Sequence, residues 1–115
     1  MVQLKGGQAL LLWRDVALAQ VHDDMPDLNL RQTAILSIVY LEPPPHTVRG
    51  LAARLGVTKP VITRALNSMG HAKLLERRRD PEDGRNVLIG RTVEGSIFLD
   101  RLATTIVEEA ARLPR

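Results

Sequence analysis

The chain of 115 residues contains no cysteine, and its three histidines lie on separate segments. Without cysteine the chain can form no disulfide bond, bind no zinc through thiolates and use no thiol nucleophile. His22, His46 and His71 lack the i, i+4 spacing that places two metal ligands on one helix face. A glycine-rich phosphate-binding loop is also missing. We therefore predict no enzymatic activity, no catalytic residues, no metal site and no cofactor.

Aromatic residues are scarce, at 3% of the chain, although 44% of the residues are hydrophobic. Leu, Val, Ile and Ala must therefore provide most of the core. Long hydrophobic runs are absent too, since Arg14 and Asp15 interrupt the apolar run from Ala9 to Trp13. Neither a signal peptide nor a membrane-spanning helix fits this pattern. We expect one domain over residues 1–115, with no membrane association and a cytoplasmic location.

Acidic residues are nearly absent from residues 49–79, where basic residues concentrate. This segment has eight Lys and Arg residues against one acid, Glu76, whereas the rest of the chain has eight against twelve. A basic patch attracts polyanions because each cation near a phosphate releases condensed counterions. An ordinary solvated basic face has the same composition, so the position of the charges on the fold must decide between the two interpretations.

Apolar residues recur every three to four positions at the start of the chain, which predicts a helix over about residues 6–23, with the clearest period from 8 to 22. Its apolar positions include Leu10, Trp13, Ala17 and Val21. The four consecutive apolar residues 10–13 cover more than half the helix circumference. This pattern suits a helix that is buried by a partner or by two sides of a small domain.

A second helix is predicted over about residues 30–41, and consecutive prolines at 43–45 end it. The residues expected to face the core are Ala34, Ile35, Ile38, Val39 and Leu41.

The segment 47–72 has the pattern of a helix-turn-helix. Thr47 is a suitable N-cap for a helix with an apolar stripe at Val48, Leu51, Ala52 and Leu55, and Gly56 ends that helix. Thr58 can cap the next helix, with Pro60 in its first turn, where a missing N–H group costs nothing. Two helices joined by such a short glycine turn are typical of a DNA-binding helix-turn-helix.

The second helix of this motif has an apolar side and a polar side. Val61, Ile62, Ala65, Leu66 and Met69 are expected to face the core. The open side then carries Lys59, Thr63, Arg64, Asn67 and Ser68. Arg pairs with guanine, Asn with adenine, and Thr with phosphate or a thymine methyl group, so this face suits the major groove. A polar solvent-exposed face has a similar composition.

A β-hairpin follows directly, with candidate strands at 74–79 and 86–91 around the turn-rich segment 80–85. A helix-turn-helix followed by a hairpin forms a winged helix. Arg85 at the hairpin tip is our candidate for the minor groove. Asp83 is more suited to internal hydrogen bonds that hold Arg77 or Arg85 and the turn in position.

Residues 51–58, Leu-Ala-Ala-Arg-Leu-Gly-Val-Thr, and residues 74–85, Leu-Leu-Glu-Arg-Arg-Arg-Asp-Pro-Glu-Asp-Gly-Arg, together resemble the MarR family of winged-helix transcription regulators. The resemblance covers about residues 30–98. It implies a mainly α fold with a small β-hairpin, flanked by N- and C-terminal dimerisation helices. It also implies a homodimer on a palindromic site of double-stranded DNA, with residues 58–67 in the major groove, Arg85 in the minor groove and Asp83 supporting the wing.

Three features depart from the family pattern. Lys73 stands where the family usually has Gly, so we expect the recognition helix to end without a left-handed residue there, unwinding earlier at Gly70. Arg91 replaces an apolar residue before Thr92, and Gly90 weakens the second strand, which makes the end of that strand uncertain. The chain is also shorter than is usual for the family, whose members carry longer terminal helices that build the dimer.

A final helix is predicted over about residues 93–113. Its apolar positions follow intervals of four and three, as in a helix that packs against another helix: Leu99, Ala103, Ile106, Ala110 and Leu113. Ile97, Leu102 and Val107 widen this stripe. With the very apolar first helix, the stripe favours a homodimer. The alternative is that the two terminal helices pack only on each other within one protomer.

Two function classes remain. In the first, the protein is a sequence-specific DNA-binding transcriptional regulator. Its predicted DNA-binding residues are Arg49, Thr58, Lys59, Thr63, Arg64, Asn67, Arg77, Arg79 and Arg85. In the second, the winged helix is a protein-interaction adaptor. The resemblance further implies a small-molecule effector of unknown identity. Trp13, Tyr40 and Phe98 are the few aromatic residues available to line its pocket, and each is also suited to ordinary core packing.

Overall fold

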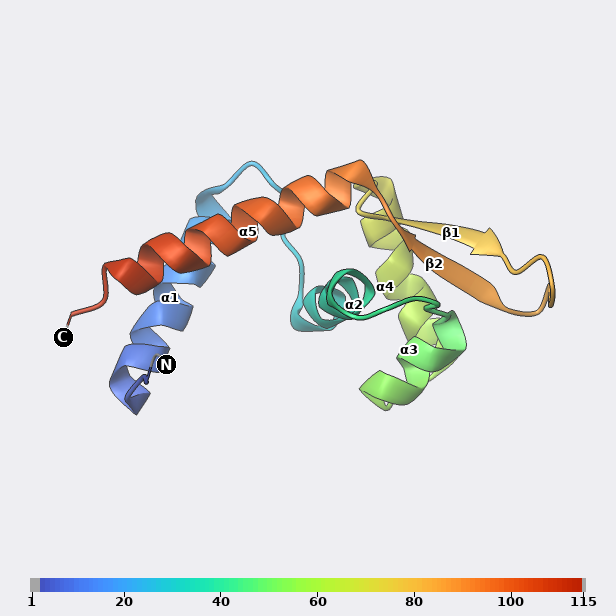
Figure 1. Ribbon diagram of the computed structural model, residues 1–115, viewed down its shortest axis with the longest axis horizontal. Coiled ribbons are helices and arrows are strands. Elements are labelled where there is room, and N and C mark those ends of the chain that lie inside the picture. The colour runs from blue at the N-terminus through green and yellow to red at the C-terminus, as the bar shows by residue number, and fades with distance from the viewer. Residues whose placement is uncertain (1–2, 115) are drawn as a thin grey trace. The chain divides into compact units, whose positions relative to one another are not determined.

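The computed structural model describes residues 3–114 and contains five helices and one hairpin in this part of the chain (Figure 1). The elements are α1 (Gly6–His22), α2 (Leu30–Leu41), α3 (Val48–Leu55), α4 (Lys59–His71), β1 (Leu75–Arg79), β2 (Val87–Arg91) and α5 (Val93–Ala111). The predicted mainly α fold with a winged helix-turn-helix is confirmed. No helix within residues 3–114 is long and apolar enough to cross a membrane.

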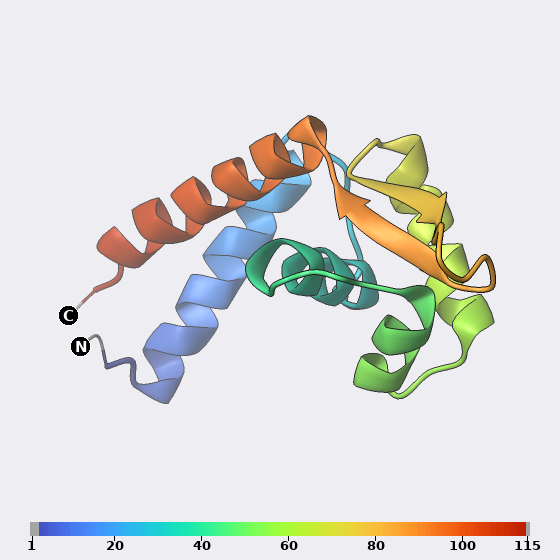
Figure 2. The ribbon, with the colours of Figure 1, turned by 45° about the vertical axis from the view of Figure 1, so that its right-hand side comes forward.

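The chain forms two compact units. Of the residues described, one unit contains 3–27 together with 98–114, and the other is Leu28–Ile97. The second unit holds α2, the helix-turn-helix α3–α4, the hairpin and the first residues of α5. Figure 2 shows the hairpin running beside α4. The predicted single domain over residues 1–115 stays a prediction.

The core of the Leu28–Ile97 unit is built from one face of each helix and the start of the hairpin. Its most completely buried side chains are Ile35, Leu36, Val39, Leu51, Ile62, Leu66, Met69 and Leu74. The apolar stripes predicted for α3 and α4 are confirmed, with Leu55 and Val61 half-buried. The prediction was wrong for Ala34 and Leu41, which are exposed. The buried face of α2 instead follows 32, 35, 36 and 39, which is one continuous helical stripe.

The helix-turn-helix is held at its ends by short-range hydrogen bonds. Thr47 caps α3 as predicted, because its Oγ1 accepts a hydrogen bond of 2.9 Å from the Gly50 amide. Gly56 ends α3 with φ 67°, in the left-handed region that glycine adopts without a Cβ penalty. Thr58 occupies the N-cap position of α4, but its side chain makes no capping hydrogen bond, so that part of the prediction was wrong. Pro60 lies in the first turn as predicted.

The end of α4 differs from the prediction in an informative way. The helix does not unwind at Gly70 but continues to His71, and Lys73 itself adopts the left-handed conformation, with φ 60°. The Lys73 amide donates to the Gly70 carbonyl and the Leu74 amide to the Met69 carbonyl, the two hydrogen bonds of a Schellman motif. Leu74 and Met69 are both buried. The burial of these two side chains and the two hydrogen bonds therefore hold Lys73 in a conformation that is less strained for glycine.

Replacing Lys73 with glycine is expected to stabilise the protein by about 1 kcal/mol, because glycine adopts φ 60° without the steric cost that a Cβ imposes. The measurement is the free energy of unfolding in urea. Ala72→Gly is the matched control, since Ala72 is right-handed with φ −84° and gains nothing from glycine. A Lys73→Gly variant less stable than the parent would contradict the interpretation of strain at this residue.

The hairpin begins and ends within one residue of the predicted bounds. The strands are antiparallel, with Leu75 opposite Arg91 and Arg79 opposite Val87. The second strand therefore continues through Gly90 to Arg91, which settles where it ends. An isolated bridge between Thr47 and Leu88 and a 2.8 Å hydrogen bond from the Ile89 amide to the His46 carbonyl attach the start of α3 to the hairpin. The helix-turn-helix and the wing are thus joined through backbone contacts.

The other unit contains α1 and most of α5. Arg101 is paired with Asp23, and Gln8 donates to the Pro114 carbonyl, so hydrogen bonds join α1 and α5 near both ends of this unit. Val16 and Phe98 are its only buried apolar residues within the part of the chain described. Trp13, by contrast, is 60% exposed. The expectation that Trp13 packs in the core was therefore wrong.

Candidate nucleic-acid interface

The open side of α4 is a continuous exposed polar surface. Lys59, Thr63, Arg64, Asn67 and Ser68 are all exposed, as is Thr58 before the first turn. The opposite side of α4 is fixed in the core through Ile62, Leu66 and Met69. Within residues 3–114 none of these six side chains has a hydrogen-bond or ion-pair partner, so their donors and acceptors are free for a ligand.

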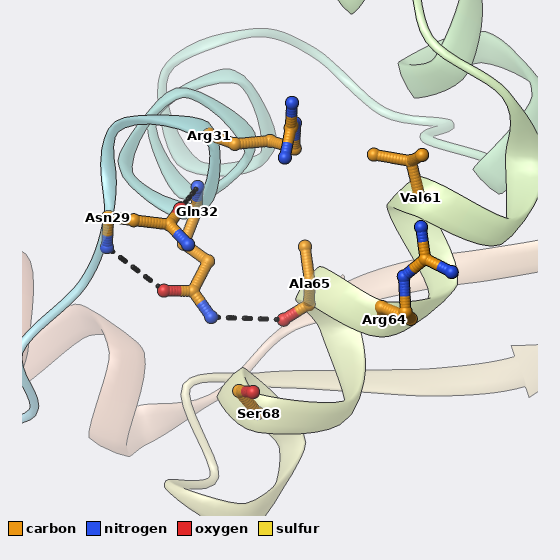
Figure 3. A pocket seen from close by; sticks show the side chains of 7 residues that line it. All are labelled: Asn29, Arg31, Gln32, Val61, Arg64, Ala65 and Ser68. Atoms are coloured by element: carbon orange, nitrogen blue, oxygen red, sulfur yellow. Dashed lines mark hydrogen bonds between the residues drawn. The ribbon is translucent and has the colours of Figure 1, made fainter.

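A hollow of about 160 Å³ lies between the start of α2 and this side of α4 (Figure 3). Asn29, Arg31 and Gln32 come from the α2 side. The α4 side contributes Val61, Arg64, Ala65 and Ser68. Arg31 and Gln32 were not identified from the sequence as part of this surface. The signal available for Gln32 was the spacing Asn-x-x-Gln before an apolar stripe, which is typical of a capping box.

The tip of the wing is organised by Asp83. Its carboxylate accepts hydrogen bonds from the Arg85 amide at 3.1 Å and from the Arg85 Nε at 3.2 Å. The Arg85 side chain and amide lower the pKa of Asp83, and the charge of Arg49 acts in the same direction. Of the two arginines considered as partners of Asp83, Arg85 is therefore the one that the structure places there. The Arg85 side chain remains 87% exposed.

The three consecutive arginines of β1 do not have equivalent positions. Because side chains alternate between the faces of a strand, Arg77 and Arg79 lie on the face that carries buried Leu75 and Ile89, and Arg78 lies on the opposite face. Arg79 donates to the Gly84 carbonyl at 2.9 Å and so links β1 to the turn. All three arginines are exposed.

Arg54 belongs to the basic segment, but its positive charge is already paired with a carboxylate within the protein. Its guanidinium makes two hydrogen bonds to the Glu42 carboxylate, at 2.7 Å and 2.9 Å. The side-chain hydrogen bond from Arg54 lowers the pKa of Glu42. The charge of the segment 49–79 is therefore not uniformly available, and Arg54 is less suited to bind a polyanion than Arg49 or Arg64.

The Tyr40 hydroxyl forms a junction between α2, α4, β1 and α5 that was not recognised from the sequence. It donates to the Leu74 carbonyl at 2.7 Å and accepts from the Thr92 amide at 2.8 Å. The Thr92 hydroxyl in turn donates to the Lys73 carbonyl at 2.6 Å and accepts from the Gly95 amide. The end of the recognition helix is thereby connected to the start of α5.

Arg91 completes this junction. Its guanidinium donates to the carbonyls of Val39 and Glu42 at 2.8 Å and 3.0 Å and lies 5.9 Å from the centre of the Tyr40 ring. A cation at the carbonyl end of a helix is favourable because the helix dipole is negative there. Arg91, which departs from the family pattern, therefore binds the C-terminus of α2.

No cluster of three or more potential metal ligands occurs in residues 3–114.

The comparison with known families decides what this arrangement represents. A model described as "MarR family" matches residues 27–86, just over half of the chain. The chain belongs to the MarR family. It is therefore a winged-helix DNA-binding transcription regulator and not an enzyme. No curated protein matches the chain.

Several solved structures have a similar fold. A variant of MepR from S. aureus has a TM-score of 0.74 at 19% identity, covering 92% of this chain and 79% of its own. A MepR–DNA complex from S. aureus has a TM-score of 0.69 at 23% identity, and the match covers 92% of this chain and 81% of the MepR chain. PcaV from Streptomyces coelicolor, solved with its natural ligand, has a TM-score of 0.65 at 24% identity, and the match covers 95% of this chain and 80% of the PcaV chain.

Proposed function

We propose that the protein binds a palindromic double-stranded DNA site as a homodimer, with α4 in the major groove and the wing in the minor groove. The observation that carries this proposal is the exposed polar side of α4, whose side chains have no partners within residues 3–114 and which is flanked by a basic hairpin. An α-helix fits the major groove, and the exposed residue types are those that pair with base edges. MepR, a structural neighbour, has been solved as a DNA complex.

The proposed contacts separate into two kinds. Thr63, Arg64 and Asn67 read bases, because they lie exposed along the middle of α4. Phosphate contacts come from residues at the edges of the surface: Arg49, Thr58, Lys59, Arg77 and Arg79. Phosphate contacts set affinity and register, whereas base contacts set specificity.

The wing contributes one further contact. Arg85 extends from the turn into solvent and is the proposed minor-groove residue, while Asp83 keeps the turn and the Arg85 stem in place. The Asp83–Arg85 pair is exposed, so Arg85 can leave the carboxylate for DNA at little cost.

Homodimerisation is supported by apolar surface that one protomer leaves uncovered. On α1, Leu10, Trp13, Leu18 and Val21 are between 51% and 72% exposed. On α5, Ile97, Ile106 and Val107 are between 40% and 69% exposed. Packing of the terminal helices within one chain does not cover these side chains. Such a surface is typical of an interface with a second chain.

Placing a charge in the α5 stripe tests the dimer. Ile106→Glu is expected to raise the dimer dissociation constant by roughly two orders of magnitude, because an unpaired charge would be buried in the interface. Sedimentation equilibrium measures the constant. Thr104→Glu adds the same charge at an exposed polar position of α5 and should leave it unchanged. If both variants associate like the parent, the stripe is not the interface.

A protein-interaction adaptor is the alternative, and salt dependence separates the two. The regulator should lose affinity for duplex DNA by orders of magnitude between 50 and 200 mM salt, roughly as expected for several phosphate contacts per protomer. The measurement is fluorescence anisotropy of a labelled duplex at a series of salt concentrations. An adaptor whose basic face is incidental should show neither this salt-dependent loss of affinity nor a preferred sequence.

An effector and a cytoplasmic location remain predictions. PcaV, a transcriptional regulator of similar fold, has been solved with its natural ligand, which supports the proposal of a small-molecule effector. None of the three hollows described on this chain is lined by Trp13, Tyr40 or Phe98. Tyr40 instead uses its hydroxyl in the junction with Leu74 and Thr92.

A further inference from the structure

The hollow beside α4 contains two arginines and no acid. Arg31 and Arg64 lie on its two walls, and Asn29 and Ser68 supply further polar groups (Figure 3). No aspartate or glutamate lines it. Neither arginine has an ion-pair or hydrogen-bond partner in the described part of the chain. Two like charges beside one hollow repel each other, and an anion bound in the hollow reduces that repulsion.

The hollow is held open by the packing of its walls. Gln32 is 7% exposed, and its Nε2 donates to the Ala65 carbonyl of α4 at 3.5 Å. Gln32 Oε1 also accepts from the Asn29 amide at 3.0 Å, and Asn29 Oδ1 accepts from the Gln32 amide at 2.8 Å. The Gln32–Ala65 hydrogen bond holds the first turn of α2 against the middle of α4, and the two hydrogen bonds between Asn29 and Gln32 fix the shape of that turn. Arg31 is therefore carried at a defined position beside the recognition surface.

We propose that Arg31 is a further DNA-binding residue and that this hollow takes a phosphodiester group of the strand that borders the major groove. The inference rests on the proposed function and extends it from α4 and the wing to α2. A helix in the major groove has a phosphate backbone on each side of it. The hollow lies along one side of α4, where such a backbone passes. Guanidinium groups bind phosphate through two parallel N–H donors.

Arg31 and Arg64 then perform different tasks at adjacent positions. Arg64 lies on α4 and reaches a base edge, whereas Arg31 lies on α2 and reaches the backbone. Backbone contacts carry no direct sequence information. Loss of Arg31 should therefore weaken binding to all sequences alike, whereas loss of Arg64 should change which sequence is preferred.

The test uses the full chain with Arg31→Gln. Arg112→Gln is the control, because it removes the same charge from an exposed arginine in the other compact unit. Affinity is measured by anisotropy against the selected site and an unrelated duplex at a series of salt concentrations. Arg31→Gln should reduce the slope of log affinity against log salt concentration by about 0.9 per protomer. It should lower the affinity for both duplexes roughly tenfold and leave the ratio of the two affinities unchanged. Arg112→Gln should leave the slope unchanged.

The outcomes distinguish this inference from the proposed function. If the parent binds no duplex at any salt concentration, the proposed function fails and the inference fails with it. If the parent binds and Arg31→Gln has the parent's slope and affinity, only the inference fails. If inorganic phosphate raises the melting temperature of the parent but not of Arg31→Gln, while the DNA slopes are equal, the hollow binds free anions and the DNA contact is contradicted. Unchanged melting temperatures without ligand establish that both variants fold.

Discussion

Replacing Gly95 with alanine is expected to destabilise the protein by roughly 3 kcal/mol or more, which is at the upper end for overpacking a core. A Cβ at this position would lie 1.8 Å from the Tyr40 hydroxyl oxygen and 2.3 Å from the Leu74 carbonyl oxygen. The carbonyl belongs to the backbone between α4 and β1 and cannot rotate away as a side chain can. The structure must therefore separate α5 from the Tyr40 junction to accommodate one methyl group.

Helix propensity alone predicts the opposite result. Gly95 lies in α5, and alanine in a helix is favoured over glycine by about 1 kcal/mol. Gly70 of α4 is the matched control, since a Cβ there meets nothing within 4 Å. We expect Gly70→Ala to be neutral or stabilising in urea unfolding. A Gly95→Ala variant as stable as the parent would show that the close approach of α2 and α5 is not maintained in solution.

Tyr40→Phe tests the mechanism of that effect. Removing the hydroxyl leaves the Leu74 carbonyl and the Thr92 amide without this partner. This loss should lower the free energy of unfolding by roughly 1–3 kcal/mol. In this background Gly95→Ala should cost less than in the parent, because the hydroxyl oxygen no longer opposes the methyl group. The contact with the Leu74 carbonyl remains, so relief is partial. Additive effects in the double variant would contradict a shared contact.

Replacing Arg64 with alanine is expected to relax base preference at one position of each half-site. A bidentate contact between arginine and guanine contributes about 1–3 kcal/mol of discrimination, which corresponds to roughly a fivefold to 150-fold change in the ratio of affinities. The structure supports this role because Arg64 is exposed at the middle of α4, between buried Ile62 and Leu66. The measurement compares the preferred site with single-base variants at constant salt.

Lys59→Ala is the control for this experiment. Lys59 lies at the first position of α4 and is proposed to contact phosphate, so its loss should weaken binding to every duplex without changing the preferred base. If Arg64→Ala also weakens all duplexes equally, Arg64 contacts the backbone and our assignment of base contacts to the middle of α4 is wrong.

The sequence predicted the parts of the fold that depend on local patterns. Gly56 and Thr47 mark the ends of α3 because left-handed backbone and side-chain capping are decided within a few residues. The polar and apolar sides of α4 follow from its period. The composition of segment 80–85 located the turn of the wing. These features require no knowledge of distant contacts.

The parts that could not be predicted depend on residues far apart in the chain. The Tyr40 hydroxyl meets partners 34 and 52 residues away, and Arg91 binds carbonyls of α2. Lys73 adopts a conformation that glycine would favour, because the buried Leu74 and the hydrogen bonds of the Schellman motif determine the backbone there. Tertiary contacts override local preference at such positions. The Arg31 hollow was missed for the same reason, since α2 and α4 meet only in the fold.

The central claim is that this chain recognises a specific DNA sequence as a dimer. Its most direct test is selection from a pool of random duplex DNA by the purified protein at physiological salt, followed by sequencing of the retained duplexes. The account predicts enrichment of an inverted repeat whose half-sites are centred about one helical turn, or ~34 Å, apart. Retention of DNA without any enriched sequence, or no retention at all, would contradict it.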